Sequence, residues 1–200
     1  MEPTVPYRPA TLAFNAPDHV ANWRPLVQWI LAIPHFLILY GLRVLSEAIA
    51  FISWFAIVFT GSLPEGLANI QMMYTRYEIR TYTYVAFMRE EYPPFNFGTT
   101  ASDGGEDPRT RVDFAPTLTD RNRLTVAFRI ILVIPHVIVL AFLGIAAAIV
   151  TLIAFFAVLF TGRWPEGMRS FVLDVLGWYL RVATYFLLLT DEYPPFTLAR

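Results

Sequence analysis

The 200-residue sequence contains no cysteine and no lysine, and only 16% of its residues are charged. The absence of cysteine excludes a disulfide framework and a cysteine-ligated metal or iron–sulfur site. The absence of lysine excludes a Schiff-base lysine and the lysine of a phosphate-binding P-loop. The formal net charge is −1, so the charge balance gives no support for a nucleic-acid partner.

Apolar residues are abundant instead. They make up 56% of the chain, against roughly 45–50% in soluble domains. Residues 26–59 and 126–160 are almost entirely apolar. One straight helix through either segment would be roughly 50 Å long, well beyond a hydrocarbon core of about 30 Å. The composition therefore predicts an all-α integral membrane protein.

The chain is an internal duplication. The stretch FTGSLPEG, which begins at Phe59, returns as FTGRWPEG at Phe160, 101 residues later. The tripeptide Ile-Pro-His and the pentapeptide EYPPF recur at the same offset. Self-similarity at a fixed period indicates repeated structural units. We expect a first repeat over residues 1–95, a flexible polar linker over 96–109 and a second repeat over 110–200.

Length suggests that each long apolar segment folds as a transmembrane hairpin of two helices, about 17 residues each. The hairpin tips would lie near Arg43–Glu47 and near Gly144, and a single long tilted or kinked helix is the alternative. The predicted spans are residues 25–43, 45–61, 125–143 and 145–162.

A third element follows each hairpin, over residues 66–88 and 167–189. Apolar residues in the first copy are spaced by three and four, and arginines lie in its middle, so we expect an amphipathic helix in the membrane interface. A spanning helix is the alternative. Two spans per repeat predict two tandem parallel repeats with both termini cytoplasmic, since that arrangement places most arginines on one face. Short alternating stretches at 10–14 and 110–114 indicate brief strands, possible partners of each other.

The repeated pattern resembles a known family. It consists of Ile-Pro-His, then FTGxxPxG, then an arginine three residues before a Thr-Tyr pair, and finally YPPF. It resembles a bacterial membrane family catalogued only as a domain of unknown function. The resemblance covers nearly the whole chain and implies a multi-pass protein of the bacterial inner (plasma) membrane. It implies no activity, ligand or catalytic residue. The first copy departs from the pattern over residues 74–83, which are more polar.

His35 and His136 are the sharpest candidates for a functional site. Two imidazoles related by the repeat could face each other and hold a haem iron or a metal. Each also follows a proline, which frees a backbone carbonyl one turn earlier, and a histidine that donates to this carbonyl would be structural. The structural role is the favoured interpretation, so we expect no cofactor, with haem as the alternative.

The FTGxxPEG motif predicts a helix stop followed by a restart, with glycine in a left-handed cap and proline at the next helix start. The residues assigned to this turn are Thr60, Gly61, Pro64, Gly66, Thr161, Gly162, Pro165 and Gly167. Three arginines are candidates for contact with lipid head groups, namely Arg80, Arg163 and Arg181. An internal salt bridge is the alternative for Arg80 and Arg181.

The apolar segments contain neither a nucleophile–base pair nor a carboxylate dyad, so we do not expect an enzyme. The favoured function is an accessory or scaffold subunit of a larger membrane complex. Membrane lipids and protein partners, or self-association, are then the expected contacts. A lipid-handling protein or small-solute transporter is the first alternative, and a bis-histidine haem redox protein is the second.

Overall fold

The computed structural model describes residues 8–198. These residues form six helices and two strands. In chain order they are β1 (Ala10–Phe14), α1 (Arg24–Leu31), α2 (Ile33–Thr60), α3 (Glu65–Val85), β2 (Thr110–Phe114), α4 (Arg123–Ala127), α5 (Arg129–Thr161) and α6 (Glu166–Phe186).

The helices α2 and α5 are each continuous, so the prediction of two hairpins is wrong and the long-helix alternative is correct. At the first predicted tip, Arg43 Nε donates to Glu47 Oε1 at 2.9 Å, and this i,i+4 pair supports the helix. At the second, Gly144 is followed closely by three alanines, which favour helix. The four predicted spans therefore fall on α2, α5 and the short helices before them.

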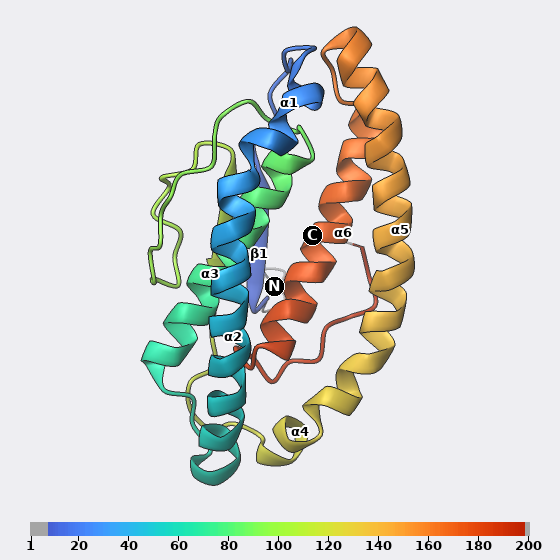
Figure 1. The fold of residues 1–200 in the computed structure, drawn as a ribbon. Coiled ribbons are helices and arrows are strands. Elements are labelled where there is room, and N and C mark those ends of the chain that lie inside the picture. Colours follow the sequence, from blue (N-terminus) through green and yellow to red (C-terminus); the bar gives the residue numbers. More distant parts are fainter. Residues whose placement is uncertain (1–7, 199–200) are drawn as a thin grey trace, which may run out of the picture.

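The two repeats run in opposite directions, so the predicted parallel arrangement is also wrong. Figure 1 shows α2 and α5 as antiparallel helices on the two sides of the molecule. The start of each repeat meets the end of the other's long helix: Val20 N donates to Gly162 O (2.8 Å) and Arg121 N donates to Gly61 O (3.0 Å). The reason is that α3 returns the chain to the end of the molecule where α2 begins. The connection between the repeats then runs back to the end where α2 stops, and α5 starts from there.

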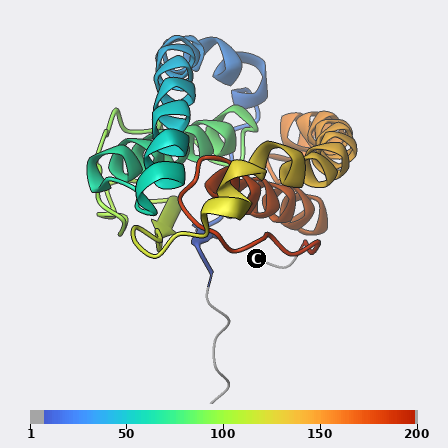
Figure 2. The ribbon, with the colours of Figure 1, turned by 90° about the horizontal axis from the view of Figure 1, so that it is seen from below.

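The elements form three layers, which Figure 2 shows in end view. The long helices α2 and α5 lie on one side of α3 and α6, and the strands lie on the other. The strands β1 and β2 pair with each other in antiparallel register, with Leu12 opposite Val112. This confirms the two strands expected from the alternating sequence.

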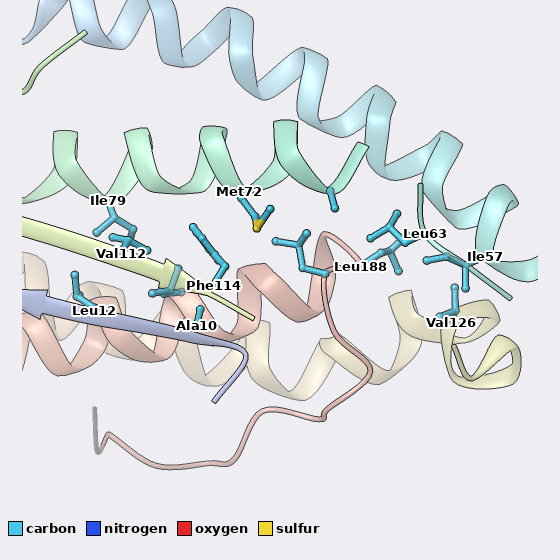
Figure 3. Packing of buried hydrophobic residues seen from close by; sticks show 13 residues of the cluster. Ala10, Leu12, Ile57, Leu63, Met72, Ile79, Val112, Phe114, Val126 and Leu188 are labelled. Carbon is cyan, nitrogen blue, oxygen red and sulfur yellow. The ribbon is translucent and has the colours of Figure 1, made fainter. Parts of the chain in front are cut away.

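The largest buried apolar cluster joins both repeats (Figure 3). Ile79 of α3 lies against Val112 of β2, and Leu63 lies near Leu188 of the second repeat. All four side chains are almost completely buried. Removing such side chains from water is the main favourable term in folding, so this cluster holds the two repeats together as one unit.

The turn between α2 and α3 and the turn between α5 and α6 have the same geometry. Gly61 and Gly162 have φ values of 75° and 67°, and each donates its N–H to the carbonyl four residues earlier. This left-handed cap ends the helix, and glycine adopts it without a steric penalty. Thr60 Oγ1 and Thr161 Oγ1 each donate to the carbonyl four residues before them, at 2.7 Å. The turn residues therefore redirect the chain by local bonding.

Residues 96–109, for which the sequence predicts a flexible linker, contain neither helix nor strand and lie against α3. Arg80 Nη2 donates to both carboxylate oxygens of Asp103, at 2.8 and 2.9 Å. Arg89 pairs with Asp107. All four side chains are buried. These buried ion pairs set the path of the chain from the first repeat back to the start of the second.

Candidate functional site

His35 and His136 are both completely buried. His35 Nδ1 shares a hydrogen bond of 2.6 Å with Tyr77 Oη, and Trp178 Nε1 donates to His136 Nδ1 at 3.3 Å. The histidines lie near the starts of α2 and α5, which are at opposite ends of the molecule (Figure 1). The two imidazoles therefore do not face each other, as a shared haem or metal would require. Within residues 8–198, no group of three or more His, Asp or Glu side chains could hold a metal ion.

The YPPF segment of each repeat covers the histidine of the same repeat. Phe95 stacks on His35 with ring centroids 4.7 Å apart, and Phe196 makes the equivalent stack in the second repeat. Tyr92 Oη donates to the carbonyl of Leu31, beside the proline at the start of α2, at 3.0 Å. The tyrosine, rather than the histidine, thus bonds to the backbone near the proline. This packing supports a structural role for the histidines.

Two of the three arginines proposed for lipid contact lie inside the protein. Arg80 is completely buried against Asp103, and the nearly buried Arg181 donates from Nη2 to Thr197 O at 2.6 Å. Burial keeps both guanidinium groups away from a bilayer surface, so they act as internal ties between a helix and a neighbouring segment. Arg163 is exposed in the turn after α5, and its contact with lipid stays a prediction.

A groove of about 540 Å³ separates α2 from α5, and we call it the α2–α5 groove. Its walls are mainly apolar and come from α5 and the end of α6. Its floor comes from the middle layer. The residues that the argument below uses are Val137, Leu140 and Ala141 on the walls, Tyr74, Glu78, Tyr82 and Tyr179 on the floor, and Arg43 and Glu47 on the rim. A smaller hollow of about 200 Å³ continues it beside Gly144.

Glu78, in the middle of α3, is the centre of the groove floor. Its side chain accepts three tyrosine hydrogen bonds: Tyr74 Oη and Tyr82 Oη donate to Oε1 at 2.9 and 3.0 Å, and Tyr179 Oη donates to Oε2 at 2.7 Å. Only 6% of the residue is exposed. Within residues 8–198 no ion pair involves Glu78. The internal salt bridge that was the alternative for Arg80 joins it to Asp103 and not to Glu78.

The three tyrosines stay protonated at physiological pH. Burial raises the pKa of Tyr74, Tyr82 and Tyr179 well above the ordinary value, and the nearby charge of Glu78 raises each pKa further. A neutral phenol can donate one hydrogen bond and still accept others. The floor of the groove is therefore a carboxylate surrounded by neutral hydroxyl groups, an arrangement suited to binding a polar group.

The floor lies where the two repeats meet. Glu78 and Tyr179 occupy equivalent positions, 101 residues apart, and they bond to each other. The polar side chains of the groove come mostly from the first repeat, because Arg43 corresponds to Gly144 and Tyr74 to Val175. Sequence reasoning missed these residues because it searched for what the repeats share. The signal was the extra polarity of residues 74–83, where the first copy departs from the second.

The outer faces of α2 and α5 are apolar and exposed. Exposed large side chains run along α5 from Ile130 (67%) to Phe160 (77%), and α2 has a similar series from Leu37 to Phe59. Single exposed apolar residues are normal, but a continuous surface of this extent is not. Among residues 8–198, α2 and α5 are the two helices long and apolar enough to cross a membrane.

Comparison with known proteins gives a family and no activity. A family described as "Domain of unknown function (DUF4389)" matches residues 22–96 and again residues 123–197. No curated protein and no solved structure matches the chain. The two matched regions coincide with the two structural repeats and confirm the resemblance based on the Ile-Pro-His, FTGxxPxG and YPPF motifs. The chain therefore belongs to the DUF4389 family and carries two tandem copies of its domain.

Proposed function

We propose that the protein is a non-enzymatic membrane protein that lies in one leaflet and holds a lipid in the α2–α5 groove. The observation that carries this proposal is the groove itself, which opens between two helices whose outer faces are apolar and exposed. The volume of the groove, about 540 Å³, is within the range of roughly 300–1,000 Å³ that is typical of small-molecule sites. This is the lipid-handling alternative of the sequence analysis.

The length of the apolar surface favours helices that lie in the membrane plane. The 33 residues of α5 extend for about 50 Å, and exposed apolar side chains follow it almost from end to end. A helix that crosses a hydrocarbon core of about 30 Å would leave a large part of this surface in water. A helix in the plane of the bilayer can bury all of it.

The position of the polar layer favours the same orientation. The strands and residues 96–109 lie beside the long helices, not beyond their ends (Figures 1 and 2). If α2 and α5 crossed the bilayer, exposed groups of this layer such as Glu106 and Arg111 would lie at hydrocarbon depth. Charged groups there cost at least about 2.5–3.5 kcal/mol each. In the in-plane orientation they face water, which the arginines of this layer suggest is the cytoplasm.

This orientation also suits a bound lipid. The open side of the groove faces the acyl chains, while its polar floor lies in the second layer, near head-group level. A lipid of the same leaflet would enter without inverting, with its head group on the floor and its chains between α2 and α5. The exposed Gly144 borders the smaller hollow that continues this space.

Filling the groove tests the proposal. Ala141 lines the groove, so Ala141→Trp should displace the lipid, and Ile149→Trp is the control, because Ile149 is exposed on the outer face of the same helix and does not line the groove. We expect about one lipid per chain to copurify with the wild type and with the control, and a loss of at least roughly fivefold in Ala141→Trp. Mass spectrometry of protein purified in mild non-ionic detergent measures the ratio.

Equal lipid content in all three proteins would contradict a lipid in the groove. The accessory-subunit hypothesis is the second candidate, and the wide exposed surface of α2 and α5 favours it to the extent that a protein could also cover that surface. A stoichiometric protein partner in the same preparations, with no retained lipid, would make it the better proposal.

A further inference from the structure

The α2–α5 groove carries a net negative charge. Its charged lining residues are Arg43, Glu47 and Glu78, one positive and two negative, so the sum is −1. Arg43 and Glu47 pair with each other on the rim at 2.9 Å. The remaining charge is that of Glu78, which is nearly buried on the floor. A buried charge without an opposite charge is unfavourable in an apolar site, so the floor favours a cation.

The hydrogen-bonding capacity of the floor specifies the kind of cation. A carboxylate has about four acceptor positions, and the three tyrosines occupy three of those of Glu78. One position on Oε2 is left. Each phenol oxygen that donates to Glu78 can still accept a bond. The floor therefore offers acceptors and no donor, which suits an ammonium group with three N–H donors and disfavours phosphate or carboxylate.

A positive charge, that of Arg43, lies on the rim of the groove, away from the negative charge on the floor. Arg43 uses Nε to bond Glu47, and within residues 8–198 its two Nη groups make no hydrogen bond. The side chain is largely exposed, and a guanidinium is a strong ligand for phosphate. An acceptor-only floor and an arginine on the rim match a head group in which an ammonium is joined by a short spacer to a phosphodiester.

We infer that the groove selects a phospholipid whose head group ends in a primary ammonium, as in an ethanolamine phospholipid. This inference rests on the proposed function and adds the head-group class. The ammonium donates to Glu78 Oε2 and to the tyrosine oxygens, and the phosphodiester lies beside Arg43. A choline head group has the same charge but no N–H donor, and a glycerol head group has no cation.

Binding of three short-chain lipids with identical chains tests the inference. We expect phosphatidylethanolamine to bind the purified protein, in non-ionic detergent, at least tenfold more tightly than phosphatidylcholine or phosphatidylglycerol. Glu78→Gln, which keeps the shape but removes the charge, should abolish this preference. Glu65→Gln is the matched control, because Glu65 is exposed on the same helix and does not line the groove. Native mass spectrometry measures the bound fraction of each lipid.

Two more variants test the phosphate contact and the ammonium contact of the head group separately. Arg43→Gln should weaken phosphatidylethanolamine at least threefold and leave dodecylamine, which has no phosphate, unchanged. Tyr179→Phe removes one hydroxyl from the floor and should reduce the preference for ethanolamine over choline at least threefold. If Glu78→Gln does not fold, Tyr179→Phe alone tests whether the floor selects the ammonium group.

The outcomes distinguish this inference from the proposed function. If the wild type binds ethanolamine and choline lipids equally, or if Glu78→Gln and Tyr179→Phe keep the preference, the inference is wrong although a lipid still occupies the groove. If Ala141→Trp also leaves lipid binding unchanged, the proposed function is wrong as well.

Discussion

Asp103→Ala is expected to lower the free energy of unfolding by about 3–5 kcal/mol, because it removes the nearest carboxylate from two buried arginine charges. Asp103 accepts both bonds from Arg80 and lies 3.5 Å from Arg76 Nε. It also accepts from the backbone N–H of Val112 in β2, at 2.9 Å. One side chain thus joins α3, the connection between the repeats and the sheet, and its loss affects all three.

Glu106→Ala is the matched control for this prediction. Glu106 belongs to the same segment, but its side chain is 47% exposed and lies 3.8 Å from Arg80. We expect its removal to change the free energy of unfolding by no more than about 0.5 kcal/mol. Denaturant titration in detergent, followed by circular dichroism, compares the variants. A loss below about 1 kcal/mol for Asp103→Ala would mean that the ion pairs contribute little to holding the connection.

Charges on the outer face of α5 are expected to release the protein from the membrane. Ile138, Ile145 and Leu152 are exposed and lie seven residues apart on one face. Each aspartate there would cost about 2.5–3.5 kcal/mol at hydrocarbon depth. Replacing all three by aspartate should reduce binding to vesicles by more than about a hundredfold. Flotation of purified protein with vesicles measures the bound fraction.

The control for the aspartate variant adds the same charge to the opposite layer. Thr11, Ala13 and Thr99 are exposed in the polar layer, and aspartate at these three positions should leave vesicle binding unchanged. If both triple variants stay bound to vesicles, the outer face of α5 does not contact lipid. If the α5 variant is instead soluble, folded and no longer bound, the face is the membrane contact.

Local features of the fold could be predicted from the sequence because local chemistry determines them. Gly61 and Gly162 adopt the left-handed caps that the FTGxxPEG motif requires. The alternating residues 10–14 and 110–114 form the two strands, and these pair with each other. The duplication itself needed only a constant offset of 101 residues.

Features that depend on distant contacts could not be predicted in this way. Composition measures how apolar a segment is, but it cannot distinguish one helix of 33 residues from a hairpin when no residue breaks the helix. The direction of the second repeat depends on the path of residues 96–122, which Asp103 and Asp107 hold against arginines of the first repeat. The sequence analysis assigned two spans to each repeat, whereas each repeat has one long helix, and this error led to the predicted parallel arrangement of the repeats.

The candidate site was missed for a related reason. His35 and His136 attracted attention because both repeats contain them, but each is packed against the YPPF segment of its own repeat. Glu78 and Tyr179 differ between the copies, although they occupy equivalent positions and bond to each other. In a duplicated chain, a position that is polar in one copy and apolar or aromatic in the other is thus a useful sign that the two copies have different roles.

The depth of α5 in the bilayer tests the central claim most directly. The chain has no cysteine, so single cysteines at positions 130, 145 and 160 can each carry a fluorophore. Quenching by lipids brominated at different chain positions then reports depth. The in-plane orientation predicts that all three labels lie at similar depth, about 5–10 Å below the head groups. Labels at 130 and 160 on opposite sides of the bilayer, about 30 Å apart in depth with 145 between them, would contradict it.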